Sequence, residues 1–143
     1  MTEIKLLNNL EIARKWDEYV QASPQGCLWH STTYLNVLSK IFGYRMFLFY
    51  AEEDQEIKGV LPLFAAPSFF GGKLRLINIP VSGWSGAIGE NTEIVLLLLA
   101  RGRELADELN AEYLELRQMQ RIKAGLAEKL SYVTFLYNLQ EGS

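Results

Sequence analysis

The sequence has few of the residues that build disulfides, histidine-based sites and membrane spans. It contains 143 residues, with one cysteine, Cys27, and one histidine, His30. A single cysteine excludes a disulfide within the chain and is typical of a reducing compartment. The longest apolar run, Ile94–Ala100, is too short to cross a bilayer, and no secretory signal pattern opens the chain. We therefore expect a cytoplasmic protein that does not associate with membranes.

The chain also lacks an excess of either charge. Lys and Arg number 14 and Asp and Glu number 17, the formal net charge is −3, and the two signs are interspersed. This balance excludes the basic footprint of a nucleic-acid-binding domain, so no DNA partner is expected. Hydrophobic residues make up 49% of the sequence. Because a domain of this length buries roughly two-thirds of its unfolded surface, we expect residues 1–143 to form a single domain.

The scarcity of cysteine and histidine limits metal and nucleophile chemistry. Cys27 and His30 have a spacing that occurs in metal sites, but a zinc site needs about four protein ligands and the sequence has no second pair. The favoured interpretation is a packed cysteine beside a histidine at a helix start. A Cys27–His30 nucleophile pair is the alternative. No metal and no cofactor are expected.

The first half of the chain has the pattern of one strand followed by two helices. A short strand is predicted over Thr2–Leu7, and the helix after it ends at Ser23, because the residue before a proline is driven out of the helical conformation. A second helix is predicted from Ser31 to Gly43, where glycine suits a left-handed C-cap. The apolar side of this helix is predicted to consist of Tyr34, Leu38 and Ile41.

The rest of the chain alternates between strand and helix patterns, with a bulge or a local edge expected at Pro62. The predicted elements are strands over Arg45–Ala51, Glu56–Ala66 and Lys73–Ile79, a helix from Asn91, a strand over Tyr113–Leu116, a helix around Ile122–Leu130 and a strand over Ser131–Leu139. Short turns make the first three of these strands antiparallel, and a long helical crossover lets the next strand lie parallel. The prediction is therefore an α+β domain of order β-α-α-β-β-β-α-β-α-β, with a mixed, mostly antiparallel sheet flanked by helices.

Five short segments carry a resemblance to a known family, in matching order and spacing. They are Trp16–Val20, Trp29–Ser31 followed by Tyr34, Phe42–Arg45, Gly59–Leu63 and Tyr113–Arg117. Together they resemble the FemAB-type aminoacyltransferases, which have the N-acetyltransferase-like (GNAT) fold. The resemblance implies transfer of an amino acid or acyl group onto an amine, with a peptidoglycan precursor as the best-known acceptor and aminoacyl-tRNA as the best-known donor.

The family carries two such halves in tandem, and this chain resembles only the first half. The family continues into a basic helical segment and a second acetyltransferase-like domain, whereas this sequence stops at Ser143. The expected function is therefore a half-domain that binds an acceptor, lacks activity alone and works with a second-half protein. The two alternatives are a non-catalytic binding or assembly module and a stand-alone N-acetyltransferase.

The glycine-rich loop after the third antiparallel strand is the predicted substrate site. Glycines let a ligand approach the backbone, serine hydroxyls bind polar atoms, and a tryptophan supplies a stacking wall. The candidate substrate-binding residues are Ser82, Gly83, Trp84, Ser85 and Gly86, with Arg45, Arg75 and Arg117 as anchors for a phosphate or carboxylate. The alternatives are a long turn on which Trp84 folds back as a lid, and arginines at the exposed ends of amphipathic strands.

Glu115 is the candidate general base, because the end of the strand on which it lies is near the reaction centre in acetyltransferase-like folds. The alternative is a surface glutamate paired with Arg117 or Lys73.

Acetyl-CoA is not expected to bind. Acetyl-CoA transferases wrap the pyrophosphate with a loop in which Gln or Arg is followed by two variable residues, Gly, one variable residue, and Gly or Ala. In this chain the glycines of the loop are spaced by three. Two acids, Glu90 and Glu93, also flank the helix start and would repel a pyrophosphate.

The predicted last strand bears on assembly. Ser131–Leu139 is rich in Tyr, Phe, Val and Leu, and no charged residue lies between Lys129 and Glu141. An apolar edge of this kind associates with another chain unless it is covered. We therefore expect a homodimer in which the C-terminal strands, or the apolar face that they leave open, meet across a two-fold axis.

Overall fold

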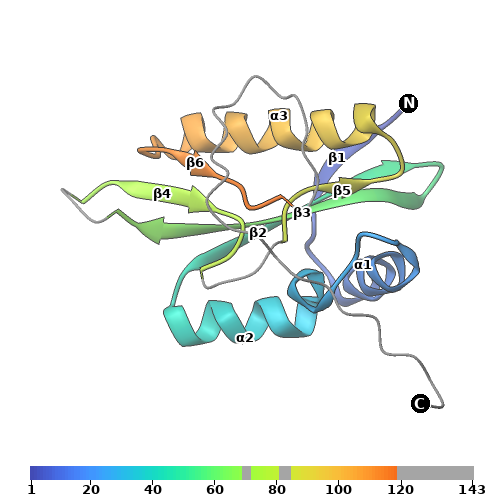
Figure 1. The fold of residues 1–143 in the computed structure, drawn as a ribbon, viewed down its shortest axis with the longest axis horizontal. Coiled ribbons are helices and arrows are strands. Elements are labelled where there is room, and N and C mark those ends of the chain that lie inside the picture. Colours follow the sequence, from blue (N-terminus) through green and yellow to red (C-terminus); the bar gives the residue numbers. More distant parts are fainter. Residues whose placement is uncertain (69–71, 81–84, 119–143) are drawn as a thin grey trace, which may run out of the picture.

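The computed structural model of the chain describes residues 1–68, 72–80 and 85–118. In these ranges a central sheet has α1 and α2 on one face and α3 on the other (Figure 1). The elements are β1 (Glu3–Leu6), α1 (Leu10–Ala22), the short 3-10 helix η1 (Leu28–His30), α2 (Thr32–Phe42), β2 (Arg45–Glu53), β3 (Glu56–Pro67), β4 (Leu74–Ile77), β5 (Ile88–Gly89), α3 (Thr92–Glu108) and β6 (Leu114–Glu115). None of the helices in the described ranges is long and apolar enough to span a bilayer.

The sheet is mixed and mostly antiparallel, as predicted. Its strand order is β1-β2-β3-β4-β6, and β5 also pairs with β3. Every pair is antiparallel except β4 with β6, which follows the crossover through α3. The predicted helix around Ile122–Leu130 and the predicted strand over Ser131–Leu139 lie outside the described residues, so the homodimer stays a prediction.

β3 is the central strand, and its two sides are paired differently. On one side β2 follows it from Glu56 to Ala65. On the other side β5 pairs with Gly59 and Val60, and β4 pairs with the stretch from Phe64 to Pro67. Around Pro62, between these two partners, no described strand lies on that side. This confirms the predicted local edge, which suits a residue without a backbone N–H.

Side chains of β2 and β3 alternate between two cores, which explains why both strands read as continuous apolar runs. Leu48 and Tyr50 pack toward α1 and α2, around the fully buried Trp16. Phe47 and Phe49 pack toward α3. Burial on both faces fixes the position of each helix relative to the sheet.

Two contacts join α1 to the start of α2. The Trp16 Nε1–H donates to the carbonyl of His30 at 2.7 Å, and the Asp17 carboxylate accepts the backbone N–H of Thr32 at 2.8 Å. Asp17 thus caps α2 from a neighbouring helix, while the Ser31 side chain makes no cap bond. Two of the segments that resemble the aminoacyltransferases therefore hold the helices together.

The predicted apolar side of α2 was wrong in part. Thr32, Leu35 and Leu38 are the buried positions of this helix, whereas Ile41 is 68% exposed. The bonds from Asp17 hold Thr32 toward α1, and the residues three and six positions later share that face. The predicted C-cap is confirmed, because Gly43 has a φ of 69°.

We expect two glycines to respond oppositely to alanine. A Cβ at Gly59 would lie 2.7 Å from the Ile94 Cγ2 atom and 2.8 Å from the Ile88 carbonyl, so Gly59→Ala should lower the free energy of unfolding by about 1–3 kcal/mol. A Cβ at Gly102, inside α3, would have ordinary contacts at 3.5 Å with Leu61 and Leu63. Gly102→Ala should therefore be neutral or add up to about 1 kcal/mol, because alanine favours helix. Urea denaturation measures both, and equal losses would contradict the packing of α3 on β3.

Candidate functional site

The sheet opens where its two parallel strands separate. β4 and β6 pair through only two register positions, Leu76 with Leu114 and Ile77 with Glu115. After Ile77 the chain leaves the sheet, and it returns to pair with β3 as β5. The end of the β4–β6 ladder is therefore a gap in the sheet that side chains and the returning loop must fill.

Asn78 bridges this opening. Its side chain is 1% exposed, and its Oδ1 atom accepts the backbone N–H of Arg117 at 2.7 Å. Its Nδ2 group donates to the Ser85 hydroxyl at 3.1 Å, and that hydroxyl donates to the Asn78 carbonyl at 3.1 Å. Buried polar groups require such partners, so one amide fixes β4, the returning loop and the chain after β6 to one another.

Gln118 makes a second link between the chain after β6 and the returning loop. Its carboxamide makes two bonds with one residue: the Oε1 atom accepts the N–H of Ala87 at 2.6 Å, and the Nε2 group donates to the carbonyl of Ala87 at 3.2 Å. This is the pairing that a neighbouring peptide group would make. A Cβ at Gly86 would overlap the Gln118 side chain, so the close approach requires glycine there.

His30 contacts the returning loop through the carbonyl of Gly86. Its ring is 1% exposed, with Nε2 3.0 Å from the Gly86 carbonyl and Nδ1 3.2 Å from the Cys27 sulfur. Because a carbonyl only accepts, these partners assign the proton of the neutral ring to Nε2, and the thiol donates to Nδ1. Burial lowers the pKa of His30 and raises the pKa of Cys27. Both shifts oppose the thiolate–imidazolium pair of a nucleophilic cysteine, so the contacts favour the packed pair.

Of the candidate loop residues, Ser85 and Gly86 lie at the opening, and Ser82, Gly83 and Trp84 lie outside the described residues. The Ser85 hydroxyl is fully buried and bonded to Asn78. The role of the five residues in substrate binding stays a prediction. Within residues 1–68, 72–80 and 85–118, no group of three or more His, Cys, Asp or Glu side chains could hold a metal ion.

The three candidate arginines do not converge. Arg117 lies at the opening, where its backbone N–H meets Asn78. Arg75 alternates with Ile77 and so lies on the α1–α2 face, where its Nε donates to the Pro67 carbonyl at 3.0 Å. Arg45 alternates with Phe47 on the α3 face. Of these three arginines in the described parts of the chain, Arg117 is the one at the opening, and a ligand-binding role for it stays a prediction.

Glu115 faces Arg117 rather than standing alone as a base. The distance between its Oε1 atom and the Arg117 Nε is 3.3 Å, and both side chains are about half exposed, at 47% and 45%. This contact is the ion pair that the sequence offered as the alternative. An exposed pair of this kind leaves the Glu115 carboxylate in contact with solvent.

The start of α3 is short and capped by its own residues. Only Glu90 and Asn91 separate β5 from α3, and the Asn91 side chain accepts the N–H of Ile94 at 3.0 Å. Glu93 lies in the first turn, and the Glu90 carboxylate is 3.6 Å from the Lys58 ammonium. This confirms the predicted helix start. Two acidic side chains, Glu90 and Glu93, therefore lie at this helix start.

Comparison with known proteins identifies the fold. No family model and no curated protein matches the sequence. Among solved structures, the chain is similar to a ribosomal-protein-alanine N-acetyltransferase from Brucella melitensis biovar Abortus 2308, with a TM-score of 0.65 and 15% identity over 97% of this chain and 99% of that one. An aminoglycoside acetyltransferase from an uncultured soil metagenomic sample matches with a TM-score of 0.62 and 15% identity, over 97% of each chain.

FemX is also similar, with a TM-score of 0.61 and 20% identity over 76% of this chain. The match spans only 25% of the FemX chain. At these identities the likeness is one of fold, and the chain therefore has the GNAT fold that the resemblance implied.

Sequence reasoning missed Asn78 and Gln118. One signal for Asn78 was present, because it is the polar residue that interrupts an apolar strand between Ile77 and Ile79. No comparable signal marks Gln118, because its partner Ala87 is distant in sequence and is bonded through its backbone.

The buried His30 predicts a specific dependence of stability on pH. Burial holds its pKa below the usual value of 6.5, so the unfolded chain takes up a proton before the folded chain does as the pH falls. The free energy of unfolding should therefore decrease as the pH falls below about 6.5, and His30→Gln should show a shallower decrease between about pH 7 and pH 5. Urea denaturation at several pH values measures the two slopes. Equal slopes would contradict a neutral, buried His30.

Proposed function

We propose that this chain is an acyltransferase-related domain that binds an amine-bearing acceptor at the β4–β6 opening, as the first half of a FemAB-like transferase would. The observation that carries the proposal is the pairing of the Gln118 carboxamide with both backbone groups of Ala87. A backbone edge that accepts a carboxamide can also accept a peptide group of an acceptor. A peptide-bearing acceptor would replace Gln118 at this edge.

The charge at the opening supports an acceptor that also carries an anion. Arg117 is the candidate arginine placed there, and its guanidinium suits a carboxylate or phosphate better than a neutral group. Glu115 would exchange its contact with Arg117 for a contact with the acceptor's amine. A peptidoglycan-precursor-like molecule combines these three features, namely peptide groups, acidic groups and an amine.

The opening supports binding more strongly than chemistry. Among the described residues, Glu115 is paired at the surface, and His30 is a buried neutral ring bonded to Gly86 and Cys27. Neither is placed to take a proton from an amine at the opening. Acyl transfer is therefore assigned to the domain only together with a second-half protein that supplies the base and the donor site.

A stand-alone N-acetyltransferase is the second candidate. It is favoured by the lengths of the neighbours, because the match covers 97–99% of the chain of two single acetyltransferases. The α3 start opposes it, because Glu90 and Glu93 would lie beside a bound pyrophosphate.

Acetyl-CoA should bind no more tightly than about millimolar, because the helix start repels a pyrophosphate and its cap is already filled. Isothermal titration calorimetry measures the affinity. Glu93→Gln is the matched variant and should strengthen binding by no more than a few-fold. Micromolar affinity in the unmodified chain would overturn the proposal in favour of the stand-alone acetyltransferase.

A soluble peptidoglycan-precursor nucleotide should bind the chain, and Arg117→Gln should weaken this binding by about tenfold through loss of a charge-assisted contact. Arg75→Gln removes an arginine of the same sheet away from the opening and should leave the affinity unchanged. Calorimetry measures all three proteins. Equal weakening by both substitutions, or no binding to the unmodified chain, would refute an acceptor site at the opening.

A further inference from the structure

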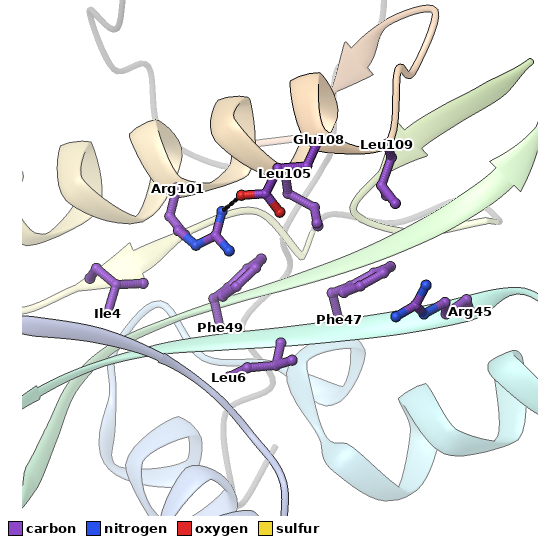
Figure 2. Close-up of a pocket in the computed structure, with 9 residues that line it drawn as sticks. All are labelled: Ile4, Leu6, Arg45, Phe47, Phe49, Arg101, Leu105, Glu108 and Leu109. Carbon is purple, nitrogen blue, oxygen red and sulfur yellow. Dashed lines mark hydrogen bonds and ion pairs between the residues drawn. The ribbon is translucent and has the colours of Figure 1, made fainter.

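A groove lies on the α3 face of the sheet, away from the β4–β6 opening. It has a volume of about 280 Å³ and lies between β1, β2 and the C-terminal half of α3 (Figure 2). We call it the β1–α3 groove; its lining residues are Ile4, Leu6, Arg45, Phe47, Phe49, Arg101, Leu105, Glu108 and Leu109. Its volume is near the lower end of the range for small-ligand pockets, roughly 300–1,000 Å³.

The floor of the β1–α3 groove is apolar and held rigidly. Phe47 and Phe49 project from β2 toward α3, with Leu105 above them (Figure 2), and the two rings are only 5% and 3% exposed. Ile4 and Leu6 form the wall on the β1 side. Strand alternation fixes these positions, so the groove needs no rearrangement to receive an apolar group.

The two arginines at the rim differ in their partners. The Arg101 guanidinium lies 5.0 Å from the centre of the Phe49 ring and is paired with Glu108 at 3.0 Å and with Glu104 at 3.5 Å. The Arg45 guanidinium lies 4.7 Å from the centre of the Phe47 ring. No carboxylate in the described parts of the chain forms an ion pair with Arg45. One end of the groove therefore carries an unbalanced cation above an aromatic floor.

We propose that the β1–α3 groove binds a small apolar monocarboxylate, with the carboxylate on Arg45 and the apolar body over Phe47 and Phe49. The guanidinium fork matches a carboxylate in shape, and its stacking on Phe47 orients it before the ligand arrives. The apolar body would cover the apolar surface that the groove leaves exposed, mainly at Leu6, which is 46% exposed. This site is separate from the proposed acceptor site, so the test of one does not depend on the test of the other.

The remaining charges of the groove set the ligand class. Glu108 and the neighbouring Glu104 already neutralise Arg101, so the groove has one cation to offer rather than two. A polyphosphate or a dicarboxylate would place its further charges near these acids. A single carboxylate on a hydrocarbon body satisfies Arg45 without that repulsion.

The test compares octanoate with its uncharged amide, octanamide, on the full chain. Methyl-detected NMR should show saturable octanoate shifts at Leu6, Leu105 and Leu109, and none at Leu35, which is buried on the opposite face. Octanamide and the Arg45→Gln variant should each bind about tenfold or more weakly, because the charge-assisted contact is lost. The control variant is Arg75→Gln, which removes an arginine outside the groove. This variant should bind octanoate as tightly as the unmodified chain does.

Three results would overturn the proposal. Equal affinities for octanoate and octanamide would show that Arg45 does not bind the carboxylate. Shifts at Leu35 instead of the groove methyls, or no saturation by about 10 mM, would remove the site. Groove shifts that follow protein concentration without octanoate would show that a second copy of the chain occupies the groove.

Discussion

The separation of β4 from β6 is the constraint on which the candidate site depends, and one buried amide maintains it. Without Asn78, the Arg117 N–H just after β6 would lose its acceptor and the buried Ser85 hydroxyl would lose a donor. An unpaired buried donor costs about 1–3 kcal/mol, which is a large fraction of the stability of a small domain. The same amide therefore stabilises the fold and defines where the sheet opens.

The polar contacts at the opening form one connected set. His30 holds the Gly86 carbonyl, Gln118 pairs with Ala87, and Asn78 holds Ser85 and Arg117. Every buried side-chain nitrogen and oxygen among the described residues has a partner. A ligand at the opening must therefore replace an existing contact, and the Gln118 carboxamide, at the end of the described chain, is the contact most like a peptide group.

The fold was largely predictable because its signals are local. Apolar runs on β2 and β3, Gly43 at a helix end, and Asn91 at a helix start each act within a few residues of the sequence. Ser85, Gly86 and Arg117 at the opening were among the candidate residues, but their contacts could not be predicted. Most of these contacts join segments distant in sequence through backbone atoms, which look alike in any sequence. The face of α2 was misassigned for the same reason, since Asp17 on another helix decides it.

Hydrogen exchange of the Arg117 amide tests the central claim most directly. In the unmodified chain this N–H should be protected, because the buried Asn78 side chain accepts it at 2.7 Å. In Asn78→Ala it should exchange about tenfold or more faster, while the Leu76 amide, which donates to Tyr113 at 2.9 Å, keeps its rate. An Arg117 amide that exchanges freely in the unmodified chain, or at the same rate in the variant, would contradict an opening held by Asn78.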